Sequence, residues 1–317
     1  MGALRASRPR FRRAGDPPHV ELTDDDVAIL RTVYRHRFVR AEDLYQLFSN
    51  RSADRLSRRL TLLFRAEYLD RPPSQIDRFK EGGGSQSMVY GLGAKGAKYL
   101  KERVGTPIGA TDWRSRNRTY TRDNLDHTLA VSTYLINLEL ACRKRGDVSL
   151  IHFERILERA PEATRRSPIP SRWTVEVNVN GTQATIMLAP DAIFALQYMN
   201  DGKLGRSYFF LEMDMGTMTI APAESVRRSE AFLYRATLLR KCLAYAESWR
   251  QDRHRNHFGI GSARVLTHTT TEARSEAIKL ATRSIEQGMK LSAGFFLFGH
   301  GYARPSLVEL LEVCPVL

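Results

Sequence analysis

The sequence is poor in cysteine and contains no long apolar run, and both absences narrow the class of protein. Its 317 residues include three cysteines, Cys142, Cys242 and Cys314, which lie far apart and form no Cys-x-x-Cys pair. This spacing argues against a disulfide framework and against a zinc knuckle. No stretch approaches the roughly 18 consecutive apolar residues of a membrane-spanning helix, and the N-terminus lacks the apolar segment of a signal peptide. We therefore expect a soluble protein of the reducing cytoplasm.

Acidic residues are scarce relative to basic ones, and the imbalance indicates a polyanionic partner. The chain holds 49 Lys and Arg against 35 Asp and Glu, which gives a formal net charge of +14. Residues 1–104 carry 21 basic and 13 acidic side chains, so more than half of the excess lies in the first third. This distribution predicts that the N-terminal third engages a nucleic acid.

Residues 1–21 are expected to form a disordered basic arm. No acidic residue precedes Asp16, whereas five arginines do. Such a run is typical of a segment that lies along phosphates, and a solubilising tail is the alternative interpretation. The five residues are Arg5, Arg8, Arg10, Arg12 and Arg13.

Two helices are predicted directly after this arm. Thr23 and Asp26 form a capping signature, and the apolar stripe that follows them predicts a helix over 23–36. Residues 38–39 are expected to form a short turn, and residues 41–48 a second, short helix whose apolar side chains face inward.

The predicted third helix combines an apolar ridge with a basic opposite face. Ser52 is suited to cap its start, and large apolar residues recur at the spacing of a helix packed on the first two. Long donors opposite such a ridge are what a recognition helix in the major groove requires, and a solvated arginine-rich face is the alternative. The ridge is Leu56, Leu60, Leu63 and Phe64, and the basic face is Arg51, Arg58, Thr61 and Arg65 with Arg55 and Arg59 on its flanks.

A hairpin and a fourth helix are predicted next. Residues 68–71 and 78–80 predict an outgoing strand, residues 81–85 a turn, residues 87–92 a returning strand and residues 93–103 a helix. The resulting order is helix, helix, helix, hairpin, helix.

This order resembles winged helix-turn-helix repressors, particularly in the stretch Tyr-Gly-Leu-Gly-Ala-Lys-Gly-Ala-Lys-Tyr-Leu at 90–100. The resemblance implies a DNA-binding domain over 22–105, with the third helix in the major groove and the wing on the DNA backbone. It assigns Arg51, Ser52, Arg55, Arg58 and Arg59 to the major groove and Arg78 and Lys80 to the phosphates, and Arg65 completes the predicted DNA-binding set.

A second domain is predicted over 120–317, after a linker at 106–119 that is rich in Gly, Pro and polar residues. Its first elements are a long helix at 124–143 and a strand at 148–153. Asn180-Gly181 then predicts a tight hairpin, because these residues readily adopt the positive dihedral angles of its turn. The remaining predictions are strands at 190–196, 207–214, 263–267 and 294–298, a hairpin loop at 198–207, and helices at 225–249 and 271–288.

Three acidic residues mark the predicted strand ends. Asp191 begins one strand, and Glu212 and Asp214 end the next on one face, because residues two apart on a strand point the same way. Clustered carboxylates suit a divalent cation such as Mg²⁺ or Mn²⁺, which activates water. A turn residue and a capped sheet end that bind nothing are the alternative interpretation.

The order of elements and acids resembles the PD-(D/E)XK nuclease fold, a restriction-endonuclease-like mixed sheet flanked by helices. The resemblance implies that Asp191, Glu212 and Asp214 hold the metal and take part in catalysis. The family has a lysine where this chain has Asp214, so enzymatic activity is an open question. Lys241 on the following helix is the candidate for a displaced ammonium group if the site is active.

Four short segments in this order resemble the replication-relaxation family of mobile-element proteins. They are His-Thr-Leu-Ala-Val at 127–131, Pro-Asp-Ala at 190–192, Leu-Glu-Met-Asp-Met-Gly-Thr at 211–217 and Lys-Cys-Leu-Ala-Tyr at 241–245. The resemblance covers about residues 22–300. It implies a winged helix paired with a degenerate nuclease-like domain, acting in the replication or transfer of a plasmid or integrative element, or in its control.

Three hypotheses follow for the α+β chain as a whole. The first is a cytoplasmic protein that binds double-stranded DNA and does not cut it, or does so only conditionally. The second is a metal-dependent DNA endonuclease, and the third is an assembly adaptor whose nuclease-like sheet docks a protein. Other mobile-element proteins and a second copy of the chain are further candidate partners, and no membrane partner is expected.

Overall fold

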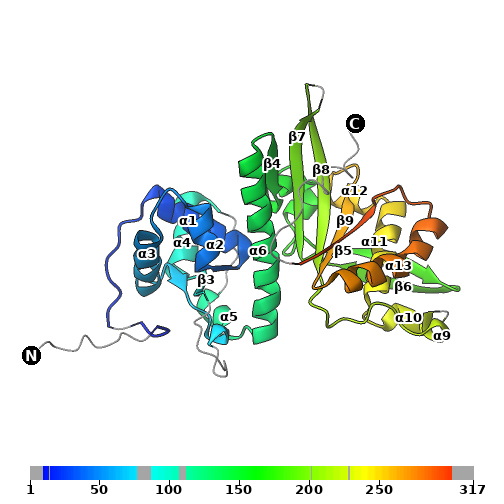
Figure 1. The fold of residues 1–317 in the computed structure, drawn as a ribbon, viewed down its shortest axis with the longest axis horizontal. Coiled ribbons are helices and arrows are strands. Elements are labelled where there is room, and N and C mark those ends of the chain that lie inside the picture. The colour runs from blue at the N-terminus through cyan, green and yellow to red at the C-terminus, as the bar shows by residue number, and fades with distance from the viewer. Residues whose placement is uncertain are drawn as a thin grey trace, which may run out of the picture. The chain divides into compact units, whose positions relative to one another are not determined.

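The computed structural model describes residues 10–13, 15–76, 87–106, 112–200, 202–227 and 229–301. It shows a mixed α+β protein, drawn in Figure 1. The chain divides into two compact units, Met1–Ile136 and Asn137–Leu317, and the boundary lies inside the helix α6 (Arg122–Arg145). Within the described ranges, no helix is both long and apolar enough to cross a membrane.

The first unit contains the four predicted helices, each of which buries one face. A capping box fixes the start of the first, since the Thr23 side chain accepts from the Asp26 amide and the Asp26 carboxylate accepts from the Thr23 amide. Ser52 caps the third helix as predicted, and the whole predicted apolar ridge is buried. The helices are α1 (Asp24–His36), α2 (Ala41–Leu47), α3 (Ala53–Arg65) and α4 (Ala94–Val104).

A three-stranded antiparallel sheet accompanies these helices. Its central strand β3 (Val89–Leu92) pairs with β1 (Phe38–Arg40) on one side and β2 (Leu69–Asp70) on the other. The 3₁₀ helix η1 (Pro73–Gln75) follows β2. The turn predicted at 38–39 is therefore wrong: these residues form a strand because β3, about fifty residues away, supplies the hydrogen bonds.

A short helix that the sequence did not predict lies in the expected linker. In α5 (Trp113–Arg118), both Trp113 and Asn117 are buried. The Asn117 amide donates to Asp70 Oδ2 at 3.1 Å and to the Leu92 carbonyl at 3.0 Å. This segment is thus anchored to the β2–β3 pair rather than spanning open solvent.

The first half of α6 also belongs to the first unit. Leu125 and Leu129 form a buried cluster with Phe38 of β1 and Val89 of β3. The predicted domain boundary at residue 105 therefore differs from the structure, in which the core of the first unit includes part of α6.

The second unit is built on a five-stranded mixed sheet of order β10-β9-β8-β7-β4. The pairs β4–β7 and β7–β8 are antiparallel, whereas β8–β9 and β9–β10 are parallel. A separate hairpin turns at Asn180 and Gly181, both at positive φ, as predicted. The strands are β4 (Val148–His152), β5 (Trp173–Val179), β6 (Thr182–Leu188), β7 (Ala192–Asn200), β8 (Lys203–Met213), β9 (Arg264–Thr269) and β10 (Phe296–His300).

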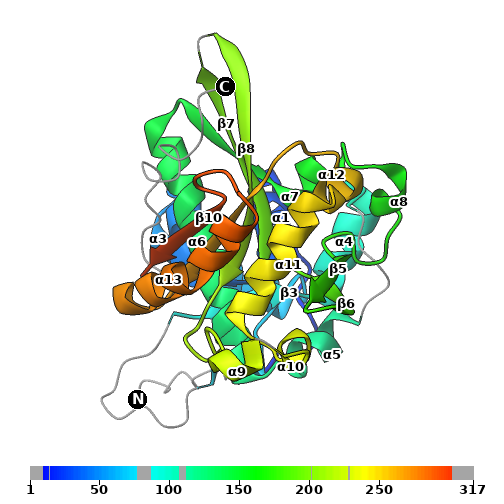
Figure 2. The ribbon, with the colours of Figure 1, turned by 90° about the vertical axis from the view of Figure 1, so that its right-hand side faces the viewer.

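Helices and the β5–β6 hairpin cover one face of this sheet. Figure 2 shows α11 between α13 and the hairpin, and all three contribute to one apolar core. Phe210 of β8 points into this core, while Phe194 and Phe209 stack on the opposite face with ring centroids 5.0 Å apart. The helices are α7 (Phe153–Leu157), α8 (Glu162–Arg165), α9 (Glu224–Arg227), α10 (Ala231–Tyr234), α11 (Leu238–Arg250), α12 (Arg253–Phe258) and α13 (Glu272–Gly288).

Two predictions for the second unit are wrong in their boundaries. The helix expected at 225–249 is divided into α9, α10 and α11, because Thr237 caps a new start by accepting from the Arg240 amide. The loop expected at 198–207 is regular hairpin, in which β7 and β8 stay paired as far as Asn200 and Lys203.

Candidate DNA interface and carboxylate site

Two arginines of α3 present their guanidinium groups to solvent. Arg55 and Arg58 are exposed, and within the described part of the chain neither side chain has an ion pair or a ring contact. Arg65, two turns beyond Arg58, is half-buried. Among the residues predicted to contact DNA, Arg55 and Arg58 thus retain their full set of donors for a ligand.

Other predicted DNA contacts are engaged within the unit itself. Arg59 donates from Nε to Asp26 Oδ1 at 2.9 Å and from its terminal nitrogen to the Glu21 carbonyl at 2.7 Å. Arg51 forms an ion pair with Asp25, and Ser52 accepts from the Arg55 amide as the helix cap. These three side chains hold α1 and α3 in place, which the arginine spacing of α3 alone does not reveal.

The Arg59–Asp26 pair is the more deeply buried of these contacts. The Asp26 side chain is 0% exposed and that of Arg59 is 22% exposed. Burial raises the pKa of Asp26, but hydrogen bonds from Arg59 and Thr23 outweigh burial, so that the pKa lies below its ordinary value. The carboxylate is therefore ionised and structural.

The described part of the basic arm also contacts the folded unit. Arg13 donates to the carbonyls of Phe64 and Leu69, at 2.8 and 3.0 Å, and to the Asp70 carboxylate at 2.9 Å. The prediction that residues 1–21 are disordered is therefore wrong at Arg13, which is held by these hydrogen bonds. Arg10 and Arg12 are exposed, and Arg5 and Arg8 lie outside the described residues.

The two predicted wing residues, Arg78 and Lys80, lie outside the described residues. Gln75, in the connection from β2 to β3, forms two hydrogen bonds with the backbone of β3 through its side chain. Its Nε2 donates to the Val89 carbonyl at 3.0 Å, and its Oε1 accepts from the Val89 amide at 2.8 Å. The β2–β3 connection therefore begins from a fixed position.

A buried carboxylate, Glu212 of β8, faces two side chains of α11. Lys241 Nζ donates to Glu212 Oε2, and the Tyr245 hydroxyl donates to Glu212 Oε1. Glu212 is 4% exposed, whereas the Lys241 side chain is 30% exposed, so the cluster reaches solvent on the lysine side. The displaced ammonium predicted from the sequence is thus in contact with Glu212.

The pKa values of this cluster follow from its burial. Burial raises the pKa of Glu212 to about 7, with Lys241 lowering it and Asp191 raising it further. Burial lowers the pKa of Lys241, but the two carboxylates outweigh burial and raise the pKa above its ordinary value. For Tyr245, burial and then Glu212 raise the pKa, so the hydroxyl keeps its proton and remains a donor.

Asp191 directly precedes β7 and lies next to the end of β8. Its amide donates to the Leu211 carbonyl at 2.9 Å, and its Oδ2 accepts from the Met213 amide at 2.8 Å. The Asp191 charge acts on Glu212, Lys241 and Tyr245 alike. The structure therefore brings together Asp191, Glu212 and Lys241.

Asp214 contacts a different set of partners. Its carboxylate accepts from the Thr269 hydroxyl at 2.6 Å, from the Arg274 guanidinium and from the Gly216 amide. Burial raises the pKa of Asp214, but Arg274 and Thr269 outweigh burial and lower it. The two carboxylates thus take different partners, because Glu212 accepts from α11 whereas Asp214 accepts from β9 and α13.

This arrangement fits a two-carboxylate cation site better than a three-carboxylate one. In the described part of the chain, no three His, Cys, Asp or Glu side chains are grouped so as to hold a metal ion. Mg²⁺, however, often binds through one or two carboxylates and completes its shell with water and phosphate oxygens. Asp191 and Glu212 match that requirement, and the Mg²⁺ or Mn²⁺ site stays a prediction.

Tyr245 and Arg274 were not predicted as site residues. Tyr245 follows Lys241 by four residues, so helical geometry places both side chains on one side of α11, and this spacing was a usable signal. Nothing local in the sequence links Arg274 to Asp214, which are sixty residues apart.

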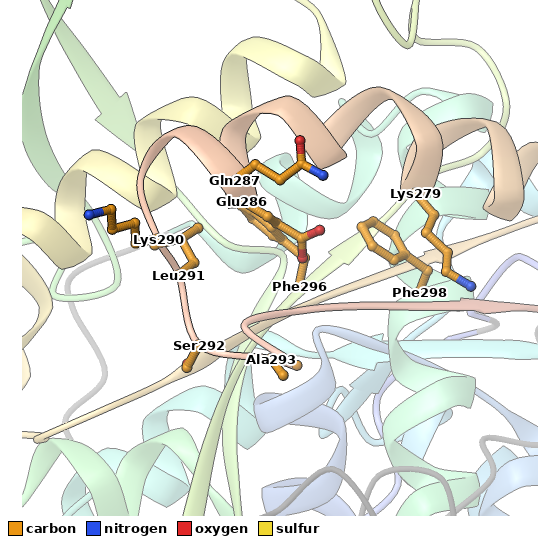
Figure 3. A pocket seen from close by; sticks show the side chains of 10 residues that line it. Lys279, Glu286, Gln287, Lys290, Leu291, Ser292, Ala293, Phe296 and Phe298 are labelled. Carbon is orange, nitrogen blue, oxygen red and sulfur yellow. The ribbon is translucent and has the colours of Figure 1, made fainter.

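An open pocket lies elsewhere in the second unit, between the end of α13 and β10 (Figure 3). Its volume is about 550 Å³, and none of the predicted site residues lines it. Its lining includes the apolar residues Leu291, Phe296 and Phe298 and the charged residues Lys279, Glu286 and Lys290.

The fold and these sites define a class of protein: an α+β protein with a basic helical unit and a separate carboxylate and lysine cluster on a mixed sheet. A family model described as replication-relaxation matches residues 30–263, and the chain belongs to this family, as its sequence motifs predicted. No curated protein and no solved structure matches the chain.

Proposed function

We propose that the protein binds duplex DNA through a winged helix-turn-helix in its first unit and acts in the replication, transfer or control of a plasmid or other mobile element. The observation that carries this proposal is α3, whose apolar ridge is buried while Arg55 and Arg58 remain exposed and unpaired among the described residues. Family membership supports the role in mobile-element replication.

The order of elements supports the winged-helix assignment. Three helices, an antiparallel β2–β3 pair and a fourth helix follow one another, and β1 completes a three-stranded sheet. In proteins of this class the third helix enters the major groove, where arginines read guanine edges. The net charge of +14 adds attraction to phosphates that is independent of base sequence.

The first test is the variant Arg55→Ala/Arg58→Ala, compared with wild type on duplexes selected by wild type from a random pool. If each arginine reads a base, each substitution weakens binding by about 1–3 kcal/mol. Arg155→Ala/Arg166→Ala removes the same charge from the second unit, at side chains 73% and 78% exposed, and should bind nearly as wild type. Failure of wild type to bind any duplex at low salt would contradict DNA binding, whereas binding without enrichment of any duplex would contradict base reading by α3.

A second candidate function is a metal-dependent DNA endonuclease, and the Lys241–Glu212 contact is the observation that favours it. Asp191 and Glu212 would hold the cation, which when bound lowers the pKa of a coordinated water. Lys241 would hold its positive charge beside Glu212 and orient water, while Tyr245 fixes the carboxylate. In this proposal α11 supplies the ammonium that position 214 lacks.

Cleavage of supercoiled plasmid in Mg²⁺ and in Mn²⁺ tests this candidate. We expect wild type to nick the plasmid, and Lys241→Ala and Glu212→Gln each to reduce the rate at least about a hundredfold. Lys279→Ala, at an exposed position on α13, should leave the rate unchanged. No nicking by wild type in either metal would exclude the endonuclease.

A further inference from the structure

The short helix α5 is held rigidly against the sheet of the first unit. Trp113 and Asn117 are one helical turn apart, and both are buried. Trp113 packs edge-on against Tyr34 with ring centroids 6.0 Å apart, and the Asn117 amide is bonded to Asp70 and to the Leu92 carbonyl. A helix of six residues would not be stable in water by itself, so these contacts fix its place and orientation.

The remaining surface of α5 is basic. Arg114, Arg116 and Arg118 are all exposed, and across the described residues none of them is paired with a carboxylate. Arg116 lies over the Trp113 ring at 5.9 Å. Arg114 and Arg118 are four residues apart, which places them on the same side of the helix.

A fourth arginine adds to the positive charge beneath this surface. The Arg37 guanidinium lies against the rings of Phe38, Trp113 and Tyr120, at 4.6, 4.9 and 5.4 Å. Its three nitrogens are buried, and among the described residues no carboxylate forms an ion pair with them. Burial, and then the charge of Arg116, lower the pKa of Arg37 to about 10.

The nearby carboxylate, Asp70, is already engaged. It accepts from Arg13 at 2.9 Å and from Asn117 at 3.1 Å, although its charge still favours the ionised form of Arg37. Packing on Trp113 thus holds Arg37 and Arg116 close together, and Arg114 and Arg118 lie on the same six-residue helix. The repulsion among these like charges is relieved when an anion binds. α5 also contacts η1, where the connection from β2 to β3 begins.

We propose that Arg114, Arg116 and Arg118, the α5 patch, bind the phosphate backbone of duplex DNA. This inference rests on the proposed function and extends it, because it adds a phosphate-binding element to the segment that the sequence marked as a linker. Guanidinium groups suit the role, since each can donate two parallel hydrogen bonds to one phosphate. Phosphate contacts fix the position of the protein on DNA without reading sequence.

The full chain is tested on a mixed-sequence fluorescent duplex and on the selected duplex, with the dissociation constant measured over a range of salt concentrations. Arg114→Ala/Arg118→Ala removes the two arginines that do not pack on Trp113. We expect its dissociation constant to rise several-fold on both duplexes and its salt slope to fall by about 2. Arg114→Lys/Arg118→Lys keeps the charge and should restore most of the slope.

Each outcome decides between the proposals. Suppose that Arg114→Ala/Arg118→Ala leaves the dissociation constant and the salt slope unchanged, while Arg55→Ala/Arg58→Ala weakens DNA binding. This outcome overturns the α5 patch and leaves the proposed function in place. An equal effect from Arg155→Ala/Arg166→Ala also overturns the patch, because net charge alone then explains the loss. If wild type binds neither duplex at low salt, the proposed function and the patch both fail.

Discussion

Arg58 and Arg59 are neighbours in the sequence but lie in different environments. Arg58 is exposed, whereas Arg59 holds the fully buried carboxylate of Asp26 at the start of α1. Successive residues of a helix point in different directions around its axis, so one side chain faces solvent and the other faces the α1–α3 contact. Function and stability should therefore separate cleanly between the two residues.

We predict that Arg59→Ala lowers the free energy of unfolding by about 2–3 kcal/mol near neutral pH, because it leaves a buried carboxylate without its ion-pair partner. Arg58→Ala should change the free energy by less than about 0.5 kcal/mol. Chemical denaturation of both variants measures the effect. Equal stabilities for Arg59→Ala and wild type would show that the pair contributes nothing.

The same pair predicts a pH dependence. The pKa of Asp26 is lowered in the folded chain, so its contribution to stability is fully present above the ordinary aspartate pKa and is lost as the pH falls through the lowered value. The difference between wild type and Arg59→Ala should therefore shrink as the pH is taken below about 4. A difference that stays constant down to pH 3 would contradict this linkage.

At the scale of elements, α4 is placed by glycines that allow close approach. A Cβ atom at Gly96 would lie 2.2 Å from the Tyr68 carbonyl oxygen, which belongs to the backbone and has little freedom to move. Gly93 has the same relation to the Glu67 carbonyl. The stretch at 90–100, which resembles a winged-helix junction, thus contains the glycines that let α4 lie directly on the turn before β2.

We predict that Gly96→Ala destabilises the protein by about 1–3 kcal/mol through overpacking. Gly288→Ala is the control, since Gly288 also lies in a helix, as the last residue of α13, but has nothing within 4 Å of the added Cβ. That control should be neutral or stabilise by up to about 1 kcal/mol. Thermal unfolding measures the stability of both variants. An unchanged stability for Gly96→Ala would mean that α4 can shift to accommodate the added methyl group at no cost.

For the whole molecule, the extent of the first unit is the main structural finding. Leu125 and Leu129 of α6 complete the core around Phe38. On the same helix, the Thr133 hydroxyl donates to Asp43 at 3.0 Å and accepts from Arg40 at 2.9 Å. A DNA-binding fragment designed to end at residue 105 would lose all of these contacts together with α5.

We predict that a fragment of residues 1–145 unfolds cooperatively, whereas a fragment of residues 1–105 does not or melts at a much lower temperature. Exposing large apolar side chains such as Phe38 costs about 1.5–3 kcal/mol each, a sizeable part of the stability of a small domain. Circular dichroism during heating measures both fragments. Equal melting temperatures would place the boundary back at residue 105.

Features that depend on neighbours in sequence were predicted from the sequence. The capping signature of Thr23 and Asp26 predicted the start of α1, and the apolar ridge predicted α3. Asn180-Gly181 predicted the turn between β5 and β6. Each signal arises within a few residues, because helix caps, helical periodicity and tight turns depend on local backbone geometry. The family, too, was identified from short motifs.

Features that depend on contacts between distant residues were decided by the tertiary structure. β1 exists because β3 pairs with it, Arg59 is structural because Asp26 lies beside it, and Lys241 meets Glu212 because α11 packs on β8. The sequence contained the charges for both candidate sites but not their pairing. Pairing is set by the packing of elements far apart along the chain, and that packing determined which arginines remain exposed and which carboxylates stand together.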